Sequence, residues 1–149
     1  AFDAQVSWDV ENKVVIVTRG SGAIKSGDTF YNSDTLFWLS RVIYAESGNQ
    51  SLDGQMAVGN VVMNRVKSPA FPNTIKEVLS QKYQFATWRD GDLANRTPNS
   101  SSVIAAKLVM DGGVVEKVKG ALYFDATGTS WASRNRQLLA VIGAHYFYL

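Results

Sequence analysis

Apolar residues cover almost the whole circumference of one predicted helix, in the stretch DTLFWLSRVIYAESGNQ at residues 34–50. Ser33 or Asp34 would cap the start of this helix, and Gly48 would end it. Its last turn carries an acid, Glu46. The apolar residues that share the face of this acid at helical spacing are Leu36, Leu39 and Ile43. The pattern predicts a helix buried in the core, with a carboxyl group that continues its apolar stripe.

The position of Glu46 predicts an unusual acidity. Burial disfavours the charged carboxylate, and the partial negative charge at a helix C-terminus disfavours it as well, so both effects should raise its pKa. A carboxylic acid that stays protonated near neutral pH suits the general acid of glycosidic-bond cleavage. The alternative is a solvated glutamate beside Gly48, and this helix by itself favours that alternative.

A second apolar helix is predicted from LDGQMAVGNVVMNRVKS, ending at about Val66 or Lys67. Its polar exceptions, Asn60 and Asn64, are one turn apart and share a face, while Gly59 would let another backbone approach closely. Because a buried amide needs hydrogen-bond partners, the two asparagines either tie neighbouring loops together or face a polar cleft. The sequence leaves these alternatives open.

Shorter elements complete the pattern. Thr74 and Glu77 have capping-box spacing for a short helix to about Leu79 or Ser80. One of residues 100–102, all serines, would cap a helix through VIAAKLVMD. The segment ALYFDA is typical of a strand, GTSWASRNRQ of a loop, and LLAVIGAHYFYL ends in an alternating run that can pair with ALYF. We therefore expect an α+β fold, a mainly helical domain with a small antiparallel β element.

A long segment between the helices, QKYQFATWRDGDLANRTPNSSS, is aromatic and shows little periodicity. Loops of this length in compact domains are usually functional or disordered, and Tyr83, Phe85 and Trp88 argue against disorder. Aromatic rings interleaved with polar side chains suit a sugar-binding cleft. The alternative, that these rings pin the loop to the core, is equally compatible with the pattern.

Residues 1–33 have a different character from the rest of the chain. The runs VSWD and KVVIVTR predict a β-hairpin, and GSGAIKSGDTFYNS reads as a Gly-rich linker. We therefore expect one principal domain at 34–149, preceded by a hairpin and linker at 1–33. The hairpin would be an appendage or the end of an upstream module.

Composition narrows the chemistry. The 149 residues are 46% hydrophobic, contain no Cys and include one His, His145, which excludes disulfides and thiol catalysis and disfavours a zinc site. We expect no metal and no cofactor, and His145 to be a hydrogen-bonded structural residue. A net charge of +2 is too small for a nucleic-acid footprint but is compatible with an anionic wall polymer. No apolar run is long enough for a membrane span, and the first residues lack the pattern of a signal peptide.

Several short motifs occur together between residues 35 and 149. They are R-x-x-Y-x-E at 41–46, G-Q-x-A-V at 54–58, N-R-V at 64–66, P-x-F-P-N-T at 69–74, Q-F at 84–85, A-L-Y-F at 121–124 and I-G-x-H-x-F-Y at 142–148. In this order the chain resembles the SleB-type cell wall hydrolases, a family that includes germination-specific spore-cortex-lytic enzymes. The N-terminal hairpin resembles the end of a copper-amine-oxidase-like stalk module over residues 8–17.

The resemblance to SleB-type enzymes implies a lysozyme-like domain, related to lytic transglycosylases, that acts on the glycan strands of peptidoglycan. Glu46 matches the family's catalytic glutamate. As the resemblance implies, it would protonate the oxygen between N-acetylmuramic acid, or its cortex lactam, and N-acetylglucosamine, and then remove the proton of the muramoyl 6-hydroxyl. We expect substrate-binding residues at Tyr44, Asn64, Gln84, Phe85 and Tyr123.

Ordinary glycosidases need a second carboxylate, and the sequence offers none on a neighbouring buried stripe. The acids in predicted loops or element ends are Asp53, Asp90, Asp92 and Asp125. A lytic transglycosylase, whose substrate supplies its own nucleophile, needs one acid, so we favour this mechanism. The alternatives are a hydrolytic muramidase that uses a second carboxylate and a non-catalytic domain that binds wall glycan.

The chain departs from the family pattern in two places. After Glu46 the family commonly continues with a charged Arg and Glu, whereas residues 47–50 here read SGNQ. The usual N-terminal peptidoglycan-binding module has no counterpart in residues 1–33, so the resemblance does not distinguish spore cortex from vegetative wall. We expect a secreted monomer that acts outside the cytoplasm, associated with the cell wall or the spore.

Overall fold

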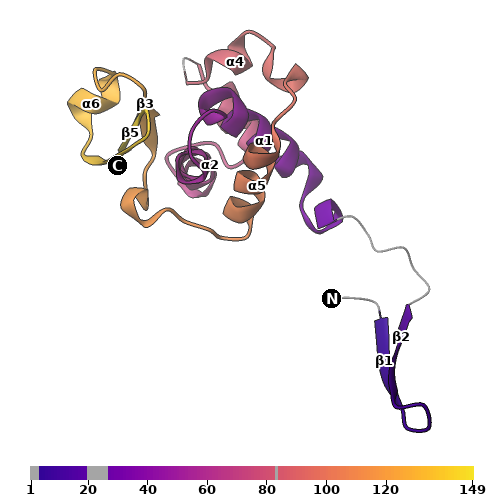
Figure 1. Cartoon of the computed structure of the whole chain (residues 1–149). Coiled ribbons are helices and arrows are strands. Elements are labelled where there is room, and N and C mark those ends of the chain that lie inside the picture. The colour runs from indigo at the N-terminus through magenta and orange to yellow at the C-terminus, as the bar shows by residue number, and fades with distance from the viewer. Residues whose placement is uncertain (1–3, 20–26, 83) are drawn as a thin grey trace. The chain divides into compact units, whose positions relative to one another are not determined.

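The computed structural model describes residues 4–19, 27–82 and 84–149 (Figure 1). The chain divides into two compact units, Ala1–Tyr31 and Asn32–Leu149. The sequence-based boundary between residues 33 and 34 lies close to this division. In the part that is described, no helix is both long and apolar enough to cross a membrane.

The first unit contains the predicted hairpin. Strand β1 (Ala4–Asp9) pairs antiparallel with β2 (Val14–Arg19). In the turn between them, Asp9 accepts hydrogen bonds from the backbone N–H groups of Glu11 and Asn12, which fixes the reversal of the chain. A short 3-10 helix, η1 (Gly27–Phe30), also belongs to this unit. The first half of the predicted linker, residues 20–26, lies outside the described residues.

The second unit begins with α1 (Ser33–Ser47), the helix predicted to bury its apolar stripe. Its N-cap is Asn32 rather than Ser33 or Asp34, because the Asn32 side chain accepts a hydrogen bond from the N–H of Thr35 at 2.9 Å. Gly48 ends the helix, as predicted. The burial is incomplete, since Phe37 is 37% exposed.

Helix α2 (Leu52–Lys67) confirms the predicted second helix, and α5 (Ser100–Met110) packs against both α1 and α2. The N-cap of α5 is Asn99 instead of one of the predicted serines. Gly59 lies where the three helices meet, because a Cβ atom there would lie 2.9 Å from Ile43 and 3.2 Å from Val109. The absence of a side chain at this position thus permits the helices to approach closely.

Two hydrophobic clusters form the core of the second unit. The larger one joins α1, α2, α5 and the short helix α3 (Ile75–Ser80), and its fully buried members are Leu39, Val42, Ile43, Val62, Val78, Leu79, Ala105 and Ala106. The smaller cluster joins α2 to the sheet through Ala57, Val58, Val61, Val118, Ala121 and Phe147. Helix α2 contributes to both clusters and is therefore the central element of this unit (Figure 1).

Short helices connect these elements. Helix α3 (Ile75–Ser80) has the predicted capping box, since Thr74 Oγ1 accepts from the N–H of Glu77 and donates to its carboxylate. The aromatic segment that was predicted to be a loop contains α4 (Ala86–Arg89) and the 3-10 helix η2 (Leu93–Asn95). Another 3-10 helix, η3 (Glu116–Val118), follows α5.

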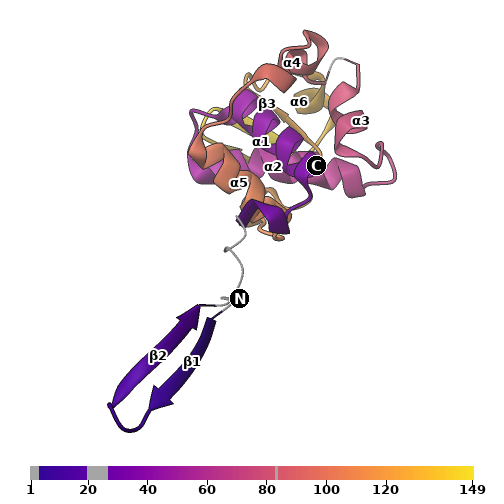
Figure 2. The same cartoon turned by 90° about the vertical axis from the view of Figure 1, so that its right-hand side faces the viewer.

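A three-stranded antiparallel sheet, in the order β3-β5-β4, closes the second unit. Its strands are β3 (Tyr123–Asp125), β4 (Leu138–Ile142) and β5 (His145–Tyr148). The predicted pairing of the last segment with ALYF is confirmed. The segment predicted to be a loop before β4 instead forms α6 (Trp131–Asn135), beside β3 in Figures 1 and 2. The expected fold, mainly helical with a small antiparallel sheet, is therefore correct.

Candidate active site

Glu46 lines a pocket of about 530 Å³ where the end of α1 meets the start of α5. We call this the Glu46 pocket, and the residues that line it are Tyr44, Ala45, Glu46, Gly48, Asn49 and Asn99. Among the described residues that line it, only Glu46 carries a carboxyl group. The glutamate is therefore open to a ligand rather than enclosed in the core.

The electrostatic environment keeps Glu46 protonated to a higher pH than usual. Burial raises its pKa, while the positive charge of Arg96 acts in the opposite direction. Arg96 is bound to Asp92, with 2.6 Å between Nη2 and Oδ2, so its effect on Glu46 is partly neutralised. The direction agrees with the sequence-based prediction, and the opposing arginine is an addition that the sequence did not indicate.

The end of α1 is shaped by close contacts around Gly48. A Cβ atom on Gly48 would lie 2.6 Å from the backbone oxygen of Tyr44 and 2.7 Å from its ring. Asn99 caps α5 and also donates a hydrogen bond from Nδ2 to the Gly48 carbonyl, at 3.0 Å. This asparagine therefore links the last turn of α1 to the first turn of α5, on either side of the Glu46 pocket.

The turn after α1 is attached to the sheet by Gln50, in the segment that departs from the family pattern. Its side-chain oxygen accepts a hydrogen bond from the N–H of Ala144, at 3.0 Å, in the turn between β4 and β5. The side chain of Gln55 donates to the backbone oxygen of Gln50 at 2.9 Å. The neutral residues that follow Glu46 thus have a structural role in holding this end of the pocket.

Three of the four acids considered as a second carboxylate are on the surface. Asp53 is exposed in the first turn of α2. Asp90 pairs with Arg89 at 3.1 Å, and Asp92 pairs with Arg96. None of the three lines the Glu46 pocket in the described structure.

The fourth acid, Asp125, is held inside a turn that follows β3. Burial raises its pKa, but hydrogen bonds from the Ser130 hydroxyl and from the N–H groups of Gly128 and Thr127 outweigh this effect and lower it. A carboxylate that accepts several hydrogen bonds is a structural anchor for the turn. It does not line the Glu46 pocket either.

The predicted substrate-binding residues fall into separate parts of the second unit. Tyr44 lies in the Glu46 pocket. Gln84 and Tyr123 line a different pocket of about 540 Å³. The structure therefore brings Tyr44 to the candidate acid and groups Gln84 with Tyr123 elsewhere.

Asn64, another of the predicted substrate-binding residues, has a hydrogen-bond partner within the fold, as does the neighbouring Asn60. Asn64 donates to the backbone oxygen of Ala121 at 3.0 Å, and Asn60 binds the backbone of Gly113 and Val115. Of the two alternatives for these asparagines, the one in which they tie neighbouring segments together is confirmed.

Phe85 is 3% exposed and belongs to the larger core cluster, so it lines neither pocket. Trp88 packs on Trp38, with 5.0 Å between ring centroids, which favours the interpretation that these rings pin the segment to the core. The third aromatic residue of the segment, Tyr83, lies outside the described residues.

His145 is buried in β5, with its ring 5.5 Å from that of Phe124. Burial lowers its pKa, against the opposing charge of Asp125. Its Nδ1 atom has no hydrogen-bond partner among the described residues, which differs from the hydrogen-bonded structural His that the sequence predicted. The histidine lines neither of the two pockets described above.

Arg65, which was not among the site residues predicted from the sequence, lines the pocket that contains Gln84 and Tyr123. We call this the Arg65 pocket, and the residues that line it are Arg65, Phe71, Gln81, Gln84, Tyr123, Phe124, Ser130, Trp131 and Ala132. Arg65 is 3% exposed even though it lies in the last turn of α2. An arginine there is normally explained by the helix dipole, so its burial could be recognised only from the structure.

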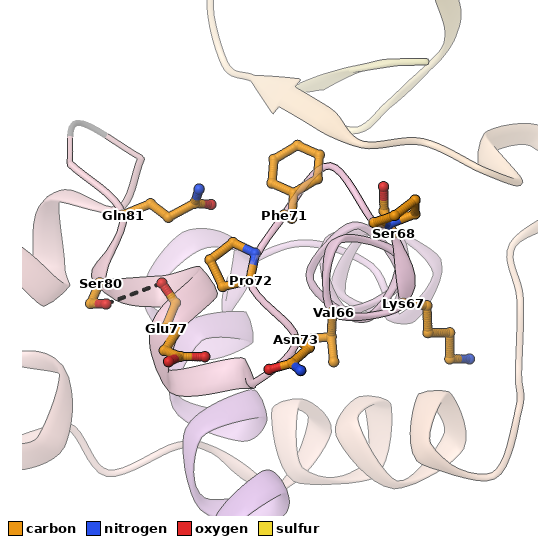
Figure 3. A pocket seen from close by; sticks show the side chains of 10 residues that line it. Val66, Lys67, Ser68, Phe71, Pro72, Asn73, Glu77, Ser80 and Gln81 are labelled. Carbon is orange, nitrogen blue, oxygen red and sulfur yellow. Dashed lines mark hydrogen bonds between the residues drawn. The ribbon is translucent and has the colours of Figure 1, made fainter.

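A neighbouring pocket of about 740 Å³ lies between the end of α2 and α3 (Figure 3). Phe71 and Gln81 line both this pocket and the Arg65 pocket, and Figure 3 shows Gln81 extending toward Phe71. The two pockets are therefore adjoining parts of one surface depression. The larger pocket does not include Glu46 and carries one carboxylate, that of Glu77, which caps α3.

The described residues contain no group of three or more His, Asp or Glu side chains that could hold a metal ion. What the arrangement around Glu46 offers chemically is a single carboxyl group with a raised pKa, open to a pocket with amide and phenol side chains.

Comparison with known proteins places the chain in a family. The sequence model of the Cell Wall Hydrolase family matches residues 49–148, a range that begins just after Glu46. The spore cortex-lytic enzyme of Bacillus cereus is 31% identical over 119 residues, which cover 78% of this chain and 45% of that protein. The spore cortex-lytic enzyme of Bacillus subtilis is 30% identical over 120 residues, covering 79% and 38%. The chain thus spans less than half the length of these relatives.

Solved structures agree with this result. The catalytic domain of the germination-specific lytic transglycosylase SleB from Bacillus anthracis superposes with a TM-score of 0.69 at 30% identity, covering 85% of this chain and all of that domain. The catalytic domain of the Bacillus cereus SleB protein gives a TM-score of 0.70 at 29% identity, covering 87% of this chain. The predicted resemblance is confirmed, and the chain belongs to the cell wall hydrolase family.

Proposed function

We propose that this protein is a peptidoglycan lytic transglycosylase that acts outside the cytoplasm, on cell wall or spore cortex, with Glu46 as its acid and base. The observation that carries the proposal is the Glu46 pocket, in which one carboxyl group with a raised pKa has no second carboxylate among the described lining residues. The names of the relatives, spore cortex-lytic enzyme and lytic transglycosylase, support the substrate and the reaction.

In the proposed reaction, protonated Glu46 donates its proton to the oxygen between N-acetylmuramic acid, or the muramic lactam of spore cortex, and N-acetylglucosamine. The bond between that oxygen and C1 of the muramoyl residue breaks, and positive charge develops on C1. The Glu46 carboxylate then takes the proton of the 6-hydroxyl, whose oxygen bonds to C1. The products are a 1,6-anhydro end and a free 4-hydroxyl, and Glu46 is again protonated.

The binding side chains of the proposed site are those that the structure groups with the acid. Tyr44 shares the pocket with Glu46, and Asn49 and Asn99 add amide groups on the same wall. Gln84 and Tyr123, in the Arg65 pocket, are proposed to contact glycan further along the strand. Asn64 and Phe85 act by holding the fold, through a bond to Ala121 and through core packing.

The proposal predicts that Glu46→Gln abolishes lysis, because glutamine cannot donate or accept the proton. The measurement is the fall in turbidity of purified peptidoglycan and of spore cortex suspensions. Glu116→Gln is the matched control, since Glu116 is an exposed glutamate of η3. Lysis by Glu46→Gln at the wild-type rate would show that Glu46 is not the catalytic acid. A difference in the wild-type rate of lysis between peptidoglycan and spore cortex would identify the natural substrate.

The variant must also remain folded. Burial raises the pKa of Glu46 above its ordinary value of 4.5, so the native state resists ionisation that the unfolded chain undergoes. Wild-type stability should therefore equal that of Glu46→Gln below pH 4.5 and become lower than it as the pH rises toward the folded-state pKa. Thermal unfolding at several pH values checks this. A large loss of stability in Glu46→Gln would assign the glutamate a structural role.

A further inference from the structure

The Arg65 pocket contains a buried cation whose charge is not paired. Arg65 donates from Nε to the backbone oxygen of Leu122 at 2.7 Å, but its Nη1 atom is buried without a hydrogen-bond partner among the described residues. None of the described residues that line the pocket is an acid. The guanidinium instead faces aromatic rings, 5.1 Å from the centroid of Phe71 and 5.4 Å from that of Tyr123.

A buried acceptor without a partner lines the same pocket. The side-chain oxygen of Gln81 is buried and makes no hydrogen bond within the described structure. Buried polar atoms are nearly always paired, because each one left unpaired loses its hydrogen bonds to water without replacement. The residues that line the pocket thus include one buried, unsatisfied N–H donor, from Arg65, and one buried, unsatisfied acceptor, from Gln81.

A ligand group that offers both an acceptor oxygen and a donor hydrogen can satisfy the two atoms, and a secondary amide does so with its carbonyl oxygen and its N–H on separate atoms, whereas a hydroxyl must use one oxygen for both. The pocket also has an aromatic platform suited to a sugar face. Trp131 is 53% exposed and its ring lies 5.7 Å from that of Tyr123. A volume of about 540 Å³ is large enough for a sugar residue.

We propose that the Arg65 pocket binds the acetamido group of an N-acetylhexosamine residue, with Arg65 donating to its carbonyl oxygen and Gln81 accepting from its N–H. The assignment of this amide to wall glycan rests on the proposed function, whereas amide recognition rests on the pocket itself. Arg65 and Gln81 would then determine specificity for the N-acetylated sugar, apart from the chemistry at Glu46.

Binding measured by calorimetry tests amide recognition separately from the proposed reaction, because it requires no turnover. The protein carries Glu46→Gln, and the ligands are chitotetraose and cellotetraose, which differ in whether an acetamido group or a hydroxyl is present on each ring. Gln81→Leu removes the acceptor while keeping similar volume, and no side-chain hydrogen bond of Gln81 is lost, so the fold should be retained. Gln137→Leu, at an exposed glutamine that lines neither the Arg65 nor the Glu46 pocket, is the matched control.

We expect chitotetraose to bind. Gln81→Leu should raise the Kd of chitotetraose about tenfold, and Gln137→Leu should leave it unchanged. The Kd of cellotetraose should be the same with and without Gln81→Leu. In nuclear magnetic resonance spectra, the guanidinium signals of Arg65 should shift with chitotetraose. Equal binding of the two sugars, or an unchanged Kd in Gln81→Leu, would overturn the proposal.

The stem peptide of peptidoglycan also contains secondary amides. A free stem peptide is therefore the third ligand, and binding of the peptide that depends on Gln81, without such binding of chitotetraose, would overturn the assignment to the sugar. If chitotetraose binds as expected while the wild-type enzyme releases no anhydro ends from peptidoglycan, the pocket assignment holds and the proposed reaction fails.

Discussion

The role proposed for Glu46 sets two requirements that conflict in most side chains, since the carboxyl group must be partly removed from water to remain protonated and yet must reach a substrate. The structure meets both by placing it in the last turn of α1, where the core ends and a pocket opens. Its apolar neighbours Leu39 and Ile43 are fully buried, so the stripe predicted from the sequence explains why burial raises its pKa.

This environment predicts a definite pH dependence. A general acid is active in its protonated form, so the rate should fall as the pH rises through the raised pKa of Glu46. Arg96→Gln removes the charge that lowers this pKa, and the alkaline limb of the profile should therefore move to higher pH. Initial rates of peptidoglycan lysis across a pH series measure this. A shift to lower pH would contradict the electrostatic account.

Individual residues were predictable when their chemistry conflicted with their neighbours in the sequence. Glu46 stood out because an acid continued an apolar stripe. Arg65 did not, because a basic residue in the last turn of a helix is ordinary, and only the three-dimensional position of Phe71, Leu122 and Tyr123 shows that it is buried.

At the level of elements, helices with a strong apolar period or a capping box were predicted, whereas α4 and α6, which have neither, were not. Helices α1 and α2 bury long stripes, so their periodicity is visible. Helices α4 and α6 span 4 and 5 residues, too few to display a period, and α6 begins with an exposed tryptophan. The caps at Asn32 and Asn99 were assigned to neighbouring residues because other good capping residues adjoin both sites, Ser33 and Asp34 at the first and serines at the second, and local sequence does not choose among them.

The packing of α1, α2 and α5 predicts the effect of a side chain at Gly59. Gly59→Val should lower the free energy of unfolding by about 1–3 kcal/mol, because added methyl groups would collide with Ile43 and Val109. Urea unfolding followed by circular dichroism measures the change. Gly27→Val is the control, since nothing lies within 4 Å of a Cβ there. Equal midpoints for the two variants would show that the helices do not meet at Gly59.

At the level of the whole molecule, the two core clusters and the three pockets described above lie within the second unit. A protein reduced to residues 32–149 should therefore fold with an unchanged melting temperature and lyse purified peptidoglycan at the rate of the full chain. Calorimetry and the lysis assay test this. A fall in melting temperature would show that residues 1–31 stabilise the second unit, and slower lysis would assign them a role in catalysis.

The family and the class of fold could be inferred from the sequence because the motifs occur in order along the second unit. The sequence did not predict which pockets those motifs build. Arg65, Gln84 and Tyr123 are far apart along the chain, and only the packing of β3 and α6 beside the end of α2 brings them together. Residues in contact through tertiary packing leave no local pattern.

The proposed mechanism requires one carboxyl group, and the ends of the released glycan strands report on this directly. Mass spectrometry of soluble fragments from purified peptidoglycan and spore cortex should find 1,6-anhydromuramic acid, or its lactam counterpart, at the wild-type cleavage sites and none with Glu46→Gln. Reducing ends in place of anhydro ends would contradict the account, because water would then be the nucleophile and a second carboxylate would be needed to activate it.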